Sequence, residues 1–447
     1  MRNLDTSKHN ISYPFTSNTT TTTTTPSPAP HKHPHRNRLT PILILSGAVL
    51  ISAILILAGP GAGLLSSLFG NKTRIPPLAA SQGVGHIFFM SSGQINEHTS
   101  QGIADEIELD LSNIASPAPG KSYYAWLLND DPAEGKALLL GQLSVNHGAV
   151  YLHYSGDPQH TNLLEVADRL LVTEEDASTV PNLPSLDTST WRYMAQIPQI
   201  PNPSDAVHHY SLLNHLRHLL ASDPTLELLD MPGGLDIWLF RNVQKVLEWS
   251  GSARDDWTTQ GTGLMHRQFI RVLDYLDGLS YVQNDVPPGT PVLVDTRIAR
   301  ASLLEFNVQQ QEPPGLLYHI GLHLQGLVGS PGATAQQKQL AIQIDTAINK
   351  VNALLQGVRQ DARRLVMMTD AQLLQPSSLS ILDDMVKQAQ DAFVGQFDPT
   401  TGEIENGVTQ IHYAIQRLAT LDVTVVPASH SGPPQGLPLQ TALYKHE

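Results

Sequence analysis

The sequence predicts a single-pass membrane protein with an extracytoplasmic β-sandwich followed by an all-α helical bundle. Three observations lead to this fold class. Residues 41–69 are apolar and uncharged, and residues 84–200 contain short runs that alternate between apolar and polar positions, as residues 106–111 do strictly. Residues 204–425 repeat apolar positions with a helical period, which predicts helices at 298–310 and 335–367 among others. Alternation with period two is typical of half-buried strands, whereas spacings of three and four residues are typical of amphipathic helices.

The apolar stretch 41–69 is predicted to cross a membrane as one helix. Its core is almost unbroken Ile, Leu, Val and Ala, and about 17–25 such residues cross the hydrocarbon. More cationic residues lie just before it (Lys32, Arg36, Arg38) than just after it, which favours a cytoplasmic N-terminus. The predicted location is therefore the cell membrane, with the bilayer as a partner and the later domains extracytoplasmic. A cleaved secretory signal is the alternative, although its apolar region is usually only about 7–15 residues long.

The rest of the chain outside the two predicted domains is expected to lack a core. It comprises a Thr/Pro/His-rich cytoplasmic tail at 1–40, a linker at 70–83 and a flexible tail at 426–447. Polar, Pro-rich segments of this kind bury too little apolar surface to offset their conformational entropy. His31, His33 and His35 in the first tail could bind a stray metal ion, but a solvated basic flank is the preferred interpretation.

Composition excludes several classes of function. The formal net charge of −14 over 447 residues argues against a nucleic-acid partner, because such proteins neutralise phosphates with a basic surface. The chain contains no cysteine, which excludes disulfides, thiolate catalysis, Cys-ligated zinc and iron–sulfur clusters. No nucleophile motif stands out, and we expect a protein that is not an enzyme.

The β part carries a set of features in a recognisable order. They are Tyr123-Tyr124-Ala125-Trp126-Leu127-Leu128, Leu139-Leu140-Gly141, Leu171-Val172-Thr173-Glu174-Glu175, Pro181 and Pro184. Over residues 84–198 this order resembles the extracytoplasmic domain of anti-sigma-K factors of the RskA type. The resemblance implies a small β-sandwich, held outside a bacterial membrane by one helix, that senses or binds a protein or small ligand.

One feature of that family is missing. Its members place a sigma-binding domain before the membrane helix, in many cases with a His/Cys zinc motif, whereas residues 1–40 here are short, lack cysteine and show no helical pattern. Binding of a sigma factor therefore does not carry over from the resemblance.

The helical part contains two groups of histidines at metal-binding spacing. His208, His215 and His218 share one flank of a helix predicted at 205–221, and His319 and His323 are four residues apart in a helix predicted at 315–328. Imidazoles on one helix face can together bind Zn, Cu or Ni. Boundary or hydrogen-bonded core histidines are the competing interpretation. Ile320 stands where a zincin would have its catalytic Glu, so metal-dependent hydrolysis by that route is not predicted.

Three functions remain open at the level of sequence. The first is a sensing, binding or scaffolding module of the cell envelope that does not catalyse a reaction. The second is a metal-binding or metal-dependent envelope protein that uses the histidines of the bundle. The third is a transmembrane regulator of the anti-sigma type, which would need a cytoplasmic binding partner.

Overall fold

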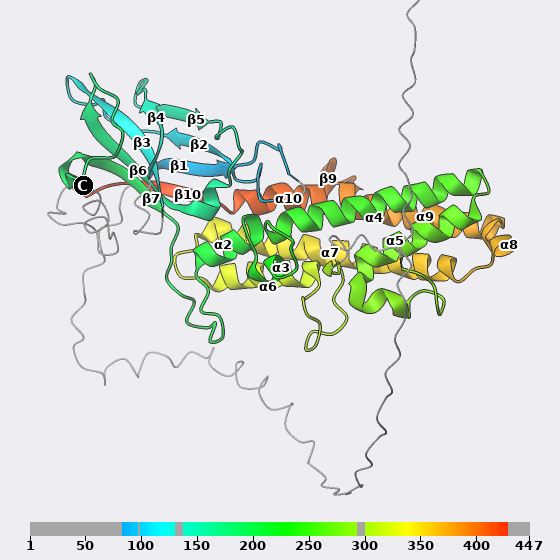
Figure 1. Ribbon diagram of the computed structural model, residues 1–447. Coiled ribbons are helices and arrows are strands. Elements are labelled where there is room, and N and C mark those ends of the chain that lie inside the picture. The colour runs from blue at the N-terminus through cyan, green and yellow to red at the C-terminus, as the bar shows by residue number, and fades with distance from the viewer. Residues whose placement is uncertain (1–82, 97–98, 130–136, 293–299, 428–447) are drawn as a thin grey trace, which may run out of the picture. The chain divides into compact units, whose positions relative to one another are not determined.

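The computed structural model describes residues 83–96, 99–129, 137–292 and 300–427, which contain an eight-stranded antiparallel sheet and a set of packed helices (Figure 1). The order of strands in the sheet is β4-β3-β6-β7-β10-β1-β2-β5. Their bounds are β1 Gly83–Met90, β2 Glu106–Leu111, β3 Lys121–Asn129, β4 Ala137–Leu143, β5 Val150–Tyr154, β6 Ala167–Asp176, β7 Trp191–Gln196 and β10 Thr420–Val425.

Alternation along the strands decides which side chains enter the core. In β2 the residues Ile107, Leu109 and Leu111 are buried, as the alternating sequence predicts. β3 is buried on both faces. One face joins the main core, and the other forms a second apolar cluster made of Tyr124, Trp126, Leu128, Leu171 and Trp191.

The predicted β-sandwich is wrong, because all eight strands belong to one continuous ladder rather than to two facing sheets. The sheet curls until its edge strands β4 and β5 approach each other. A Cβ atom on Gly141 in β4 would lie 3.3 Å from Leu152 Cδ1 in β5. Short alternating strands separated by turns are compatible with both arrangements, so the sequence pattern alone does not distinguish them.

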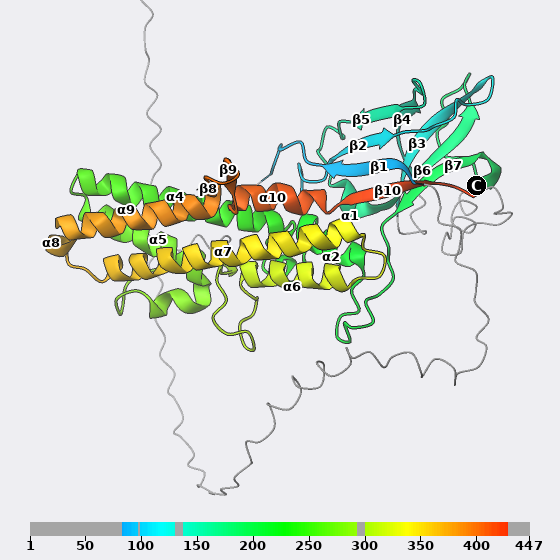
Figure 2. The ribbon, with the colours of Figure 1, turned by 180° about the vertical axis from the view of Figure 1, so that it is seen from behind.

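The helices form a bundle that is seen from two sides in Figures 1 and 2. The longer ones are α2 Leu212–Leu220, α4 Leu235–Thr258, α5 Thr262–Tyr281, α6 Leu316–Gly329, α7 Ala335–Val366, α9 Pro376–Val394 and α10 Val408–Arg417. Shorter elements are α1 Leu163–Val166, α3 Pro224–Glu227, α8 Asp370–Leu373 and the hairpin of β8 Gln396–Asp398 with β9 Glu403–Glu405. α4 packs on α5 and α9, and α7 packs on α5, α6 and α9.

The predicted single-pass membrane architecture is also corrected. Within the part of the chain that the structure describes, none of the helices combines the length and the apolar character needed to cross a bilayer. The physical reason is that these helices are amphipathic: α7 buries one side and carries Lys350, Arg363 and Arg364 on its exposed side. Residues 41–69, which carried the prediction, lie outside the described residues.

Two predicted helices change their extent for local reasons. The helix expected from residue 205 begins only at Leu212, because Ser211 and Asn214 form a capping box there. The helix expected at 298–310 is not formed over its described residues, 300–310. In that segment Ser302 Oγ and Gln311 Nε2 both donate to the carbonyl oxygen of Leu304, 2.8 and 3.0 Å away, and hold the chain in turns.

The sheet and the bundle share one hydrophobic core, and β10 follows α10 to take a central place in the sheet. Gln337, near the start of α7, holds the chain in place where it passes from α10 into β10. Its amide nitrogen donates to the carbonyl oxygens of Leu418 at 2.9 Å and Thr420 at 3.2 Å, and its amide oxygen accepts from the backbone of Thr334.

Gln337→Ala is expected to lower the free energy of unfolding by about 1–3 kcal/mol, because the carbonyl groups of the buried Leu418 and the half-buried Thr420 lose a donor. Chemical denaturation measures this loss. Gln336→Ala is the matched control, since Gln336 precedes it on the exposed side of α7 and should change stability by less than about 0.5 kcal/mol. Equal effects of the two substitutions would contradict a role for Gln337 in fixing the passage into β10.

Candidate metal centre

Four histidines and one aspartate meet where α2, α3 and α6 come together. His215 and His218 come from α2, His319 and His323 come from α6, and Asp223 precedes the first turn of α3. All five are buried: the histidines are 4–8% exposed and Asp223 is 1% exposed. Histidines three and four residues apart on a helix share a face, and the packing of α2 on α6 turns the two faces toward each other.

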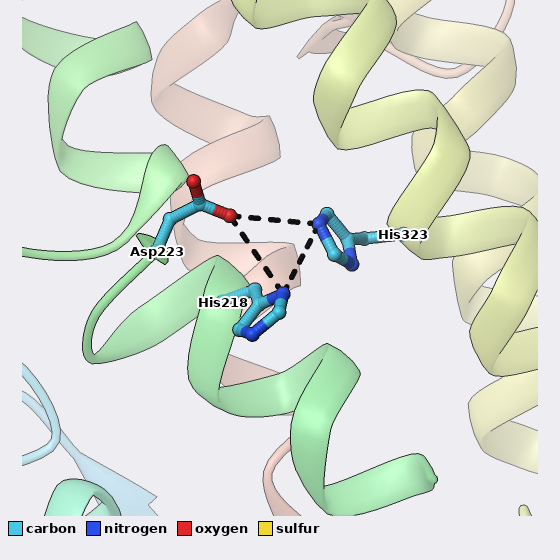
Figure 3. Close-up of side chains that lie close together, drawn as sticks. All are labelled: His218, Asp223 and His323. Carbon is cyan, nitrogen blue, oxygen red and sulfur yellow. Dashed lines mark hydrogen bonds and ion pairs between the residues drawn. The ribbon is translucent and has the colours of Figure 1, made fainter. Parts of the chain in front are cut away.

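Asp223 is held so that its two oxygens have different roles. Oδ1 accepts hydrogen bonds from the backbone nitrogens of Thr225 at 2.9 Å and Leu226 at 3.2 Å, which makes Asp223 the N-cap of α3. Oδ2 is directed at the histidines (Figure 3). It lies 3.6 Å from Nε2 of His319, 3.6 Å from Nε2 of His323 and 3.7 Å from Nδ1 of His218.

These ion-pair distances are longer than direct hydrogen bonds, which join N and O atoms at about 2.7–3.2 Å. They are instead close to the separation between neighbouring ligands of one ion, since ligands placed tetrahedrally at Zn–N distances of about 2.0–2.1 Å are roughly 3.3–3.4 Å apart. Nε2 of His323 completes the set, 3.3 Å from Nε2 of His319 and 3.4 Å from Nδ1 of His218.

The donor atoms of His218, Asp223 and His323 all lie within 4.8 Å of one another (Figure 3). His319 lies beside this group of three: its Nε2 is 3.3 Å from His323 Nε2 and 3.6 Å from Asp223 Oδ2, but it is not among the donors that all lie within 4.8 Å of one another. The group offers two imidazole nitrogens and one carboxylate oxygen, and His319 would add a third imidazole nitrogen. Such nitrogen and oxygen donors suit Zn²⁺ and other divalent transition metals.

Burial also sets the charge of the cluster. It lowers the pKa of His215 to about 4 and that of His323 to about 3, and it lowers the pKa of His218 and His319 as well. Burial alone would raise the pKa of Asp223, but its interactions with His323 and His319 hold it below its usual range. Near pH 7 the imidazoles are neutral and the carboxylate is ionised, which are the forms that bind metal ions.

The aromatic side chains of His215 and Tyr210 pack against the donor residues. Nδ1 of His215 lies 3.0 Å from Nδ1 of His323, the nitrogen of His323 that faces away from Asp223. The ring of Tyr210 stands edge-on to His218 with centroids 4.7 Å apart. This side of the cluster is thereby closed by aromatic rings.

The structure brings together four of the five histidines singled out in the sequence and leaves one apart. His208 precedes α2, its side chain is 58% exposed, and its ring stacks on Tyr210 with centroids 4.9 Å apart. Asp223 was not predicted. A local signal for it exists in Asp223-Pro224-Thr225, where an aspartate before a proline marks the start of a helix.

A second group of Ser, His and Asp lies at the sheet but lacks catalytic geometry. Oδ2 of the buried Asp105 receives Ser92 Oγ at 2.6 Å and faces His160 Nδ1 at 2.9 Å, and Ser92 Oγ lies 3.4 Å from that same nitrogen. In a catalytic triad the histidine separates the two, with Ser at one ring nitrogen and Asp at the other. Here the three side chains tie the loop after β1 to the start of β2.

In comparisons with known proteins, no protein family, no curated protein and no solved structure matches the chain. The resemblance of residues 84–198 to the anti-sigma-K extracytoplasmic domain therefore stays a prediction without further support.

Proposed function

We propose that this protein binds one divalent transition-metal ion, with Zn²⁺ as the best fit, through His218, Asp223, His319 and His323. The observation that carries the proposal is the set of His–Asp separations of 3.6–3.7 Å, too long for hydrogen bonds and suited to ligands around an ion. As a buried hydrogen-bonded core, the same residues would leave Asp223 Oδ2 without a partner at hydrogen-bond distance among them.

The chemistry of the donors favours a structural role for the ion over hydrolysis. Four protein ligands fill a tetrahedral zinc site, whereas catalytic zinc keeps one position for water. Every donor residue is at most 8% exposed, and Ile320 stands where a zincin has its general base. The ion would join α2, α3 and α6, three elements that are separate in the chain.

The test is a metal titration of the full chain, purified without an affinity tag and stripped of metal. His31, His33 and His35 are first replaced by alanine, so that the N-terminal tail cannot contribute. Competition between this parent protein and a chromophoric chelator should show one Zn²⁺ per chain, and Co²⁺ should give the visible absorption of a tetrahedral site.

Two variants of that parent decide the outcome. His323→Ala should abolish tight binding, because His323 contacts every other donor, whereas His153→Ala, an exposed histidine of β5, should leave it unchanged. A parent protein that takes up no Zn²⁺, or a His323→Ala variant that binds as tightly as the parent, would overturn the proposal.

A further inference from the structure

We infer that His215, which is not one of the four donors, positions His323 by accepting a hydrogen bond from the Nδ1–H group of His323. The Nε2 atom of His323 is then free to face the ion. This inference rests on the proposed metal function. It assigns His215 a role as a positioning residue, and it predicts that the affinity for the ion depends on a side chain that does not touch it.

The first step concerns the two nitrogens of His323, which point to different partners. Nε2 lies among the donors, 3.3 Å from His319 Nε2 and 3.6 Å from Asp223 Oδ2. Nδ1 lies 3.0 Å from His215 Nδ1, a normal hydrogen-bond distance. A neutral imidazole carries one proton. With that proton on Nδ1, His323 donates to His215 and keeps the lone pair of Nε2 for the metal.

The second step concerns how firmly His215 is held. It lies in the first turn of α2, directly after the capping box that begins at Ser211. Its ring packs against the backbone of α6 at Gly326, where a Cβ atom would lie 2.2 Å from His215 Cε1 and 2.4 Å from its Nε2. The glycine therefore gives His215 the room to reach His323.

The third step concerns the unused nitrogen of His215. Nε2 is buried and has no hydrogen-bond partner. A histidine kept only for its packing could be replaced by an apolar residue without leaving such a group unsatisfied. The contact that offsets this cost is the one at Nδ1 with His323, and outer partners of this kind orient metal-binding histidines in many sites.

The experiment compares His215→Asn and His215→Leu in the parent protein described above. Asn can place an amide oxygen where histidine has Nδ1, and Leu offers no acceptor. His215→Leu is expected to bind one Zn²⁺ with a dissociation constant raised about 10–100-fold, while His215→Asn should stay within a few-fold of the parent. In the zinc-loaded parent, ¹⁵N NMR of the imidazoles should show His323 protonated at Nδ1.

Each outcome has a distinct meaning. Parent-like zinc affinity in His215→Leu would overturn the inference and leave the proposed function intact. Equal losses in His215→Leu and His215→Asn would show a packing role and also overturn it. A parent protein that binds no zinc would overturn both proposals. Thermal unfolding of the metal-free variants serves as the folding control, because a loss of affinity without a lower melting temperature is not a folding defect.

Discussion

Asp223→Asn is expected to remove most of the stabilisation that zinc confers, while lowering the stability of the metal-free protein by a smaller amount. Asparagine is as good an N-cap as aspartate, so the hydrogen bonds from Thr225 and Leu226 that begin α3 are kept. The substitution removes only the buried negative charge. Without an ion that charge interacts only with the neighbouring histidines, which hold its pKa below the usual range, and with an ion it is a ligand.

The size of the effect follows from linkage between binding and folding. Zn²⁺ present at about 1,000 times its dissociation constant stabilises the folded state by about 4 kcal/mol, and the variant should lose the larger part of this. Chemical denaturation in the presence of Zn²⁺ measures the stability of the zinc-bound protein, and denaturation in the presence of a chelator measures that of the metal-free protein. Asp255→Asn, at an exposed position of α4, is the control. If Asp223 served only a hydrogen-bonded core, the variant would lose the same stability with and without zinc.

Arg359→Met is expected to lower the free energy of unfolding by about 3–5 kcal/mol at pH 8, because it leaves the buried carboxylate of Asp277 without a cation, whereas Asp285 keeps Arg363, whose Nε lies 2.8 Å from Asp285 Oδ1. Arg359 Nε lies 2.6 Å from Asp277 Oδ1, and the same guanidinium pairs with Asp285. Both carboxylates are at most 2% exposed. Methionine keeps most of the aliphatic length of the side chain but not the guanidinium, whose central carbon lies 4.7 Å from the centroid of the Phe306 ring, so the loss reports on the charged group.

The loss should be smaller at pH 5 than at pH 8. Burial raises the pKa of Asp277 to about 7 even with Arg359 present. A group whose pKa is higher in the folded state contributes stability at low pH that is lost as the pH rises through that value. Without the cation the folded pKa rises further, so the cost grows with pH. Arg364→Ala, at an exposed position of α7, is the control, and a pH-independent loss would contradict the explanation.

Helices and strands were predicted correctly from the sequence where one hydrophobic pattern was long and uninterrupted. The helix predicted at 335–367 is α7 Ala335–Val366, and the alternation of residues 106–111 is β2. β10 escaped prediction because Thr420–Val425 directly follows a helical pattern. Its partners β1 and β7 lie far away in the chain, and pairing across such distances leaves no local trace.

The candidate site could be predicted only in its helical half. The spacing of His319 and His323, and that of His215 and His218, places each pair on one helix face, but only the packing of α2 on α6 brings the pairs together. His208 was grouped with them because a longer helix was expected, and the capping box at Ser211 excludes it. Asp223 lies beyond the end of α2, where helical periodicity carries no information.

The central place of β10 also determines when the sheet can form during synthesis. Thr424 in β10 pairs with Met194 in β7 across 230 residues, and β10 also pairs with β1 near the start of the described chain. At about 5–20 residues per second, β1 leaves the ribosome on the order of tens of seconds before β10. Until then β1 and β7 each present an open edge, the feature by which strands join other chains. Nascent chains that stop before Thr420 therefore expose two strand edges that are paired once β10 has joined the sheet.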